Sequence, residues 1–340
     1  MHRLFTRIGL LVFLLVALAV PAMAQQSAGG ASLFISPSAR ADGMGRAFVS
    51  IADDPSATWW NPAGLGFQKD AAVQTNYAKL VPDLADDVFH LYLSYVHRGS
   101  SWGTFGGSFT YLSYGTSQVT KADDGSGSTA VVDSFTSYEL APTLSFGTAV
   151  NNNVAIGFSV KLLYVNLAPG NALKEAGVGT AADIKGSGTS VAADFGILLR
   201  DSLQVGGKDL VLGAGAALQN LGPSISFVDQ ANSDPLPRNL HIGFHTKYAF
   251  QPGYGLTVAA NLQQPLVNSR DRGIWHLGAE LVAAGTLAGR VGYISDPDGD
   301  IKDATYGLGI MITNFELDFA SVPQATGLAR VKKFGLRANW

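Results

Sequence analysis

From about residue 70 to its end, the chain falls into segments of roughly ten residues in which apolar and polar side chains alternate. In one of them Phe89, Leu91 and Leu93 share a face, and His90 and Ser94 lie on the other. Successive side chains of a β-strand point to opposite faces, whereas a helix would spread these apolar residues around its whole surface. The alternation therefore predicts β-strands throughout this part of the chain.

The pattern predicts fourteen strands, near residues 70–81, 88–98, 102–115, 135–149, 153–166, 187–200, 209–219, 239–249, 255–265, 273–283, 286–295, 303–313, 315–322 and 330–340. An even number of antiparallel strands can close into a barrel, in which no sheet edge is left and every backbone group is paired. We expect an all-β fold of this kind, a transmembrane antiparallel β-barrel.

Composition decides that the barrel lies in a membrane. Only 14% of the residues are charged, against roughly 25% in a soluble domain. Both faces of the predicted strands are poor in charge, which lipid outside and a polar lumen inside explain and a water-exposed sandwich does not. A hydrophobic content of 47% excludes a disordered chain, and a net charge of −3 argues against nucleic-acid binding. Without cysteine, the chain has no disulfide, thiolate metal site or lipoprotein anchor.

The N-terminus has the three parts of a secretory signal peptide. Arg3 and Arg7 form a basic start, an apolar run follows from residue 8 to residue 20, and small residues precede a cleavage point after Ala24. An uncleaved anchor is the alternative. We expect a signal peptide at 1–24, a separate N-terminal segment at 25–68 and a barrel at 69–340, with no transmembrane helix because no later stretch has eighteen consecutive apolar residues.

The lengths of the connections predict the orientation. If the mature N-terminus is periplasmic, the connections 116–134, 167–186 and 220–238 are external, and all three are long and rich in Gly, Ser, Asp and Asn. The connections on the other side are short, at 99–101, 150–152, 201–208, 251–254, 284–285 and 314. Long external loops and short periplasmic turns are typical of the outer membrane, which places both termini in the periplasm.

The last segment ends on an aromatic residue. Phe334, Leu336 and Trp340 share one face, a pattern that looks like the C-terminal signal read by the barrel-assembly machinery. The simpler interpretation is an aromatic anchor at the membrane interface. Both interpretations place the segment in the outer membrane.

Residues 25–68 do not alternate, and so compact a segment before the first strand could fold into the lumen as a hatch. Pro55 can open a short helical turn, and Asn61-Pro62 with Gly64 predicts a turn. The residues that stand out here are Arg40, Gly43, Met44, Gly45, Trp59, Trp60, Asn61, Pro62 and Gly64.

These residues carry a resemblance to a known family. The stretches 39–49 and 53–65, with further matches at 213–222, 236–243 and 317–320, resemble the PorV/PorQ family of the FadL-like superfamily of outer-membrane barrels. The resemblance implies a fourteen-stranded barrel with an N-terminal hatch. It also implies one of two roles: an accessory that carries cargo in type IX secretion, as in PorV, or a FadL-like route that binds a hydrophobic molecule and releases it through a lateral gap.

Alternation places a set of ionisable side chains on the inner face of the barrel. A lumen that guides a polar or amphipathic solute would explain them, and so would mixed charges that satisfy one another around a plug, which we favour. The set comprises Lys161, Asp194, His241, His245, Lys247, His276, Glu280, Arg290, Glu316, Asp318, Lys333 and Arg337.

Metal binding and catalysis find little support. His241 and His245 lie roughly 13 Å apart along a strand, too far for one metal ion. Asp296, Asp298 and Asp300 are weak calcium candidates without EF-hand spacing, and turn formation explains them better. No Gly-x-Ser-x-Gly elbow or phosphate-binding loop occurs in a suitable context, so we expect neither an enzyme nor a cofactor.

Two classes of function remain. A secretion accessory would contact secreted cargo proteins or secretion-complex subunits through the long external loops, and we favour this role. A transporter would hold a hydrophobic small molecule between hatch and wall and would need a weak strand, for which the glycine-rich segment 209–219 is the candidate.

Overall fold

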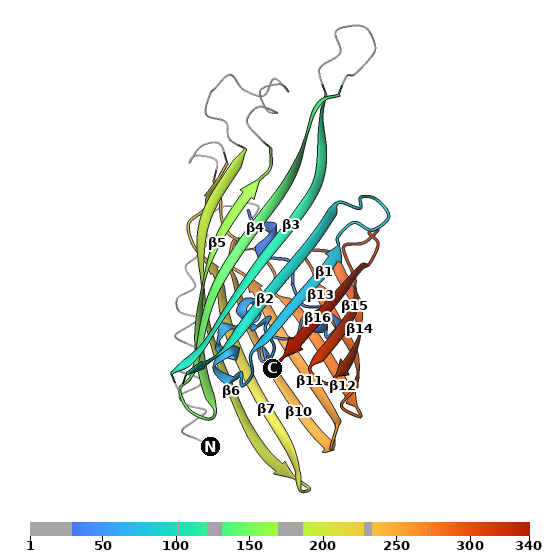
Figure 1. Ribbon diagram of the computed structural model, residues 1–340. Helices are drawn as coiled ribbons and strands as arrows, with labels where there is room; N and C mark the ends of the chain where they lie inside the picture. The colour runs from blue at the N-terminus through green and yellow to red at the C-terminus, as the bar shows by residue number, and fades with distance from the viewer. Residues whose placement is uncertain (1–28, 101, 121–130, 169–185, 228–232, 269) are drawn as a thin grey trace.

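A computed structural model describes residues 29–100, 102–120, 131–168, 186–227, 233–268 and 270–340, and confirms the predicted fold class. Fourteen antiparallel strands close into one barrel (Figure 1). They are β1 (Ala72–Lys79), β2 (Val88–Ser100), β3 (Gly103–Thr120), β4 (Val131–Ala149), β5 (Val154–Asn166), β6 (Ser187–Val205), β7 (Lys208–Leu221), β10 (Asn239–Gln251), β11 (Tyr254–Pro265), β12 (Ile274–Ala283), β13 (Leu287–Asp296), β14 (Ile301–Ile312), β15 (Phe315–Val322) and β16 (Val331–Asn339).

Each barrel strand pairs with its neighbours in the chain, so the topology is a simple meander. Between β7 and β10 lies a separate two-stranded sheet of β8 (Ile225–Ser226) and β9 (Ser233–Asp234). The ends of the meander join, because β1 pairs with β16, and Ala71 and Trp340 exchange backbone hydrogen bonds of 2.9 and 3.1 Å beyond the last ladder pair. The C-terminal strand therefore completes the barrel.

Three expectations about the strands and their connections are corrected. The connection expected at 116–134 is partly strand, because β3 continues to Thr120 and β4 starts at Val131; residues 121–130 and 169–185 lie outside the described residues. The turn expected at 201–208 shrinks to Gly206 and Gly207, which both have positive φ. The weak strand proposed at 209–219 is wrong, because residues 210–219 pair with β10 without interruption, and residues 209–218 pair with β6, whose register shifts only beyond Leu218.

The outer face of the barrel is apolar. Leu144 is 76% exposed and Leu308 is 63% exposed, as expected where lipid replaces water. Aromatic rings form two continuous rows across neighbouring strands, of the kind that anchors a barrel at membrane interfaces. One row comprises Tyr77, Phe89, Tyr111, Tyr138 and Tyr164, and the other, nearer the short turns, comprises Trp102, Phe105, Phe146 and Phe158.

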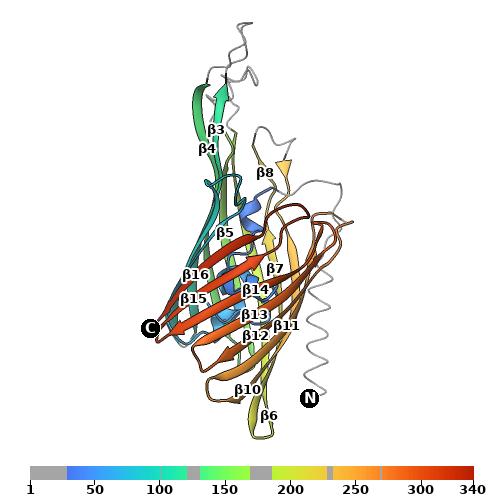
Figure 2. The ribbon, with the colours of Figure 1, turned by 90° about the vertical axis from the view of Figure 1, so that its right-hand side faces the viewer.

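Residues 29–68, the described part of the N-terminal segment, lie inside the barrel and form a plug (Figures 1 and 2). We call this part the hatch. Its elements are η1 (Ala31–Leu33), α2 (Ala39–Gly43), α3 (Ala57–Trp60) and η2 (Pro62–Phe67). No helix in the described part of the chain is long and apolar enough to cross a membrane.

Glycines of the wall let the hatch backbone touch the strands directly. A Cβ atom on Gly292 of β13 would lie 2.1 Å from the amide nitrogen of Gly45, and one on Gly278 of β12 would lie 2.2 Å from the carbonyl oxygen of Met44. Wall glycines that meet the hatch backbone or the Asn61 side chain in the same way are Gly147, Gly157, Gly196, Gly215 and Gly307. Close contact between the hatch backbone and the strand backbone thus explains part of the glycine content of the strands.

This fit predicts the effect of one added side chain. We expect Gly292→Val to lower the free energy of unfolding by at least about 2 kcal/mol, because backbone atoms of the hatch cannot move aside as a flexible side chain can. Urea unfolding in detergent or vesicles, followed by tryptophan fluorescence, would measure the loss. Gly289→Val on the same strand is the matched control, since nothing lies within 4 Å of its Cβ position. Equal effects of the two substitutions would contradict the idea that the hatch needs glycine at its contacts with the wall.

Candidate functional site

The Asn-Pro-Ala-Gly motif fixes the hatch to the wall. The Asn61 side chain accepts a hydrogen bond from the Ala63 amide at 3.1 Å and so caps η2, and its amide donates to the carbonyls of Val49 at 3.0 Å and Ile197 at 3.1 Å. Pro62 occupies the first position of η2, where no N–H is needed. A Cβ atom on Gly64 would lie 2.0 Å from the carbonyl oxygen of Ala52. Each residue of the motif therefore meets a local requirement of the plug.

The two tryptophans form the apolar centre of the hatch. Trp59 and Trp60 are buried, and their rings meet edge to face at 4.7 Å. Phe48 packs on Trp60 at 6.0 Å. From the wall, the Gln219 side-chain amide donates to the carbonyls of Trp59 and Trp60 at 2.6 and 3.1 Å. The pair packs the hatch together and also connects it to β7.

A buried ionic network joins the hatch to the opposite wall. The Arg40 guanidinium donates from Nε and Nη2 to the two carboxylate oxygens of Glu280, both at 3.0 Å, and from Nη1 to Asp53 at 2.6 Å. Arg40 is 8% exposed and Glu280 is 3% exposed. A two-point contact of this kind orients both groups, and truncating either one would leave a buried charge uncompensated.

The network continues along the wall through Arg290. Its Nε donates to Glu280 at 2.7 Å, its Nη1 to Asp318 at 2.5 Å and its Nη2 to Glu316 at 2.9 Å. Arg337 adds a further ion pair to Glu316. Five residues predicted to face the lumen thus meet in one cluster, which spans β12, β13, β15 and β16.

A second ionic contact lies on the long-connection side of α2. Lys333 of β16 contacts Asp42 at 2.5 Å, and Arg46 contacts the same carboxylate at 3.2 Å. Burial alone would raise the pKa of Asp42, but the adjacent ammonium of Lys333 and guanidinium of Arg46 outweigh it and hold the pKa below its ordinary value. Asp42 is therefore charged and forms part of the attachment of the hatch.

The remaining predicted lumen residues occupy separate places. Lys161 pairs with Asp194 at 2.7 Å and donates to Asn220 at 2.8 Å.

The three predicted histidines each contact the hatch separately. The His241 ring lies 6.2 Å from the Trp60 ring, His245 lies 3.2 Å from the Ser50 hydroxyl, and His276 lies 2.9 Å from the Gly45 carbonyl. Lys247 borders a recess at the short-turn end. Across the described ranges, no three acidic or histidine side chains converge as metal ligands.

The aspartates considered for calcium serve a turn. The Asp296 carboxylate accepts hydrogen bonds from the amides of Asp298 and Gly299 at 3.1 and 2.8 Å. Asp298 forms an ion pair with Arg272 at 2.7 Å. Asp300 has a φ of 52° within the same turn. These contacts match turn formation, which the sequence favoured for this segment.

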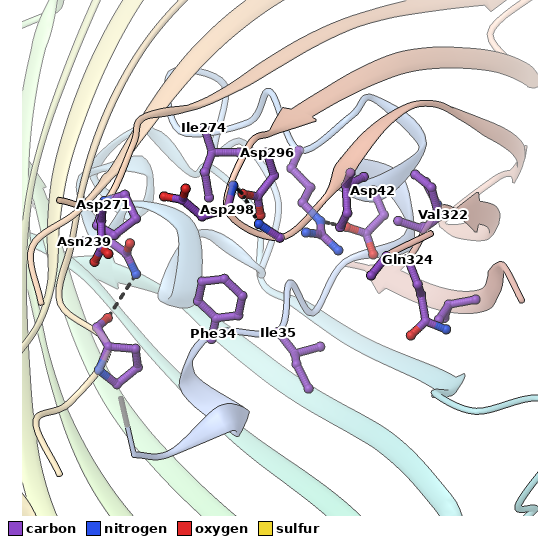
Figure 3. Close-up of a pocket in the computed structure, with 18 of the residues that line it drawn as sticks. Phe34, Ile35, Asp42, Asn239, Asp271, Ile274, Asp296, Asp298, Val322 and Gln324 are labelled. Atoms are coloured by element: carbon purple, nitrogen blue, oxygen red, sulfur yellow. Dashed lines mark hydrogen bonds and ion pairs between the residues drawn. The ribbon is translucent and has the colours of Figure 1, made fainter. Parts of the chain in front are cut away.

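A cavity of about 600 Å³ lies between the hatch and the long-connection end of the barrel (Figure 3). Phe34 and Ile35 of the hatch reach into it, and the ion-paired Asp42 lies at its border. We call this space the mouth cavity. Its volume is typical of small-molecule sites, and its apolar walls include Val267, Ile274, Ile301, Val322 and Leu328. The sequence pattern did not reveal the cavity, because its walls come from segments far apart in the chain.

The network predicts a large cost for removing its central cation. We expect Arg290→Met to lower the free energy of unfolding by about 3–5 kcal/mol, since Glu280, Glu316 and Asp318 would lose a buried partner. Urea titration of the folded barrel would measure this loss. Arg272→Met is the control, because its ion pair with Asp298 is exposed and should change stability little. A similar small change for both variants would contradict a structural role of the network.

Asp53 and Asp54 are adjacent, and we expect their charges to have opposite effects on stability. Burial raises the pKa of Asp54, whereas the Arg40 guanidinium outweighs burial and lowers the pKa of Asp53. The charge of Asp54 therefore costs no stability below its unfolded pKa, and the cost grows with pH until it is complete above its folded pKa. The charge of Asp53 stabilises the fold above its unfolded pKa, and this gain is lost as pH falls through its folded pKa.

Asp54→Asn should therefore raise the stability measured at pH 7, and Asp53→Asn should lower it. The Asp54 difference should shrink toward pH 4, whereas the Asp53 difference should persist there and shrink only at lower pH, because the folded pKa of Asp53 is lowered. The Asp53 effect should be the weaker in size because its side chain is 41% exposed. Urea midpoints between pH 2 and pH 8 would measure both differences. Two variants that change stability with the same sign at pH 7 would contradict this assignment.

The chain matches the family model of the type IX secretion system protein PorV over residues 24–272. No curated protein sequence matches it. Among solved structures, the toluene transporter TbuX of Ralstonia pickettii superposes with a TM-score of 0.53 at 15% identity, covering 88% of this chain and 97% of TbuX. The toluene transporter TodX of Pseudomonas putida gives 0.53 at 13% identity, covering 94% and 98%.

At such identities the two structures establish a shared fold and nothing about substrates. The family match is different in kind, since it follows the sequence itself across most of the chain, from residue 24, ahead of the hatch, to residue 272, just before β12. The chain belongs to the PorV family of type IX secretion system proteins.

Proposed function

We propose that this protein is a non-enzymatic outer-membrane accessory of type IX secretion, which contacts secreted cargo or secretion-complex subunits at its external end. The family match over residues 24–272 is the observation that carries this proposal. We further propose that residues 1–24 are a cleaved signal peptide, that the segment 25–68 is the hatch and that residues 69–340 form the barrel. In this arrangement both termini are periplasmic and the long connections are external.

The filled lumen supports a role at the surface. The hatch presses on wall glycines and is held by buried ion pairs of Arg40 and Lys333. A plug attached in this way does not suit an open pore for folded proteins. Contact with a partner protein therefore belongs at the ends of the barrel. Most of the mixed lumenal charges are paired with the plug or with one another.

The β3–β4 hairpin offers such a surface. The β2 ladder ends at Tyr114 and the β5 ladder ends at Tyr138, so beyond these residues, within the described ranges, β3 and β4 pair only with each other. Figure 1 shows the two strands rising well past the rest of the barrel. Thr116, Gln118 and Ser134 are exposed on the projection. It presents polar side chains and unpaired strand edges to a partner.

A position-specific cross-link tests the proposal. We expect a photo-reactive residue at Gln118 to capture secreted proteins or secretion-complex subunits in native outer membranes, identified by mass spectrometry after gentle detergent extraction. The control has the photo-reactive residue in place of Gln204, which is exposed at the short-turn end, and should not capture these proteins. A barrel that purifies alone, with no capture at Gln118, would contradict the secretion role.

Transport of a hydrophobic small molecule is the second candidate, and two observations favour it. The mouth cavity is one. The other is a break in the β4–β5 ladder, whose pairs pass from Leu140 to Thr143, leaving Ala141 and Pro142 unpaired on that side. Proline has no N–H to donate, and a hollow of about 550 Å³ lies beside it on the outer face. A defined lipid or aromatic compound bound to a barrel without protein partners in the same mass spectra would support this role instead.

A further inference from the structure

We propose that a small recess at the short-turn end of the lumen binds an oxyanion, a carboxylate or a phosphate group, between the hatch and the wall. This short-turn recess is lined by Asp53, Phe67 and Gln68 of the hatch and by Arg200 and Lys247 of the wall, among other residues. Its volume is about 240 Å³, below the range typical of drug-sized ligands. It therefore suits a small anion. The inference does not depend on the secretion role.

The key feature is a guanidinium that is held in place without a carboxylate. Arg200 of β6 lies over the Phe67 ring, with its central carbon 3.5 Å from the ring centroid. Stacking on the ring fixes the plane of the guanidinium and leaves its N–H groups at the edge, the geometry that suits two oxygens of one anion. Among the described residues, no carboxylate lies within 4.0 Å of the Arg200 side-chain nitrogens.

Other donors in the recess are also available. Lys247 of β10 is exposed in it and makes no ion pair within the described ranges. The Gln68 side-chain nitrogen is buried and has no hydrogen-bond partner there. A buried donor without an acceptor is costly, so an oxygen atom beside Gln68 would be stabilising. One ligand could thus receive hydrogen bonds from both the hatch and the wall.

The acidic side chain in the recess is directly bonded to a third cation. Asp53 is bound to Arg40 at 2.6 Å, and Arg40 is in turn held by Glu280. Arg200 and Lys247 therefore remain as two cations without a directly bonded carboxylate. Metal cations are poorly suited to such a lining, whereas an oxyanion would be attracted by both side chains.

Titration with inorganic phosphate tests the proposal on the full mature chain in detergent micelles. At constant ionic strength, we expect phosphate to raise the thermal midpoint of unfolding in a saturable way, because a ligand of the folded state stabilises it. Phosphorus NMR line widths would report binding independently. Acetate in place of phosphate would show whether a carboxylate is bound as well.

Substitutions locate the site. Arg200→Gln and Lys247→Gln should each weaken apparent phosphate affinity about tenfold, the effect of one lost charge-assisted hydrogen bond. Arg200→Lys should give a partial loss of phosphate affinity, since lysine keeps the positive charge but lacks the planar guanidinium that lies on the Phe67 ring and donates two parallel hydrogen bonds. Lys332→Gln is the control, because Lys332 is exposed on β16 outside the recess. It should bind phosphate as the unmodified chain does.

Two results would overturn the proposal: no saturable effect of phosphate or acetate on the unmodified chain, or unchanged affinity in the double variant Arg200→Gln/Lys247→Gln. Heat-modifiable migration in gels would show that each variant forms a barrel. If the double variant does not fold, the decisive comparison is between Arg200→Lys and Lys332→Gln, and equal phosphate affinity in these two would reject the site.

Discussion

The attachment of the hatch to the wall through buried ion pairs is the constraint on which the rest of the structure depends. Arg40 reaches from α2 to Glu280, and Glu280 shares its charge with Arg290. Charges this deeply buried are tolerated only when each finds a partner. Without the hatch, Glu280 of the wall would lose its partner Arg40, and without Glu280 the buried Arg40 of the hatch would lose its partner in the wall.

The same attachment explains the composition of the strands. Where hatch backbone and strand backbone touch, as at Gly278 and Gly292, the inner face has room only for hydrogen. Where the two are further apart, polar side chains such as Gln219 and Lys333 cross the gap and bind hatch carbonyls or carboxylates. The inner face is thus shaped around one particular plug, and its charges serve attachment before they serve any passing solute.

A barrel closed by such a plug has its accessible surfaces at its two ends, and these differ. The long-connection end has the mouth cavity and the projecting β3–β4 hairpin. The short-turn end has a small recess with an unpaired guanidinium. Membership of the PorV family assigns the molecule to a secretion system, whereas the superposition on toluene transporters concerns the fold alone.

The sequence by itself determined the strands, because a period of two is a local property that each strand expresses independently. It also determined the membrane setting, the fourteen-strand count and the hatch motif. Only the tertiary structure decided which inward charges meet, since Arg40 and Glu280 are 240 residues apart and alternation gives a face but not a partner. For the same reason the mouth cavity, the unbroken pairing of β7 with β10 and the break beside Pro142 were not predictable: each depends on contacts between segments that the local pattern leaves unrelated.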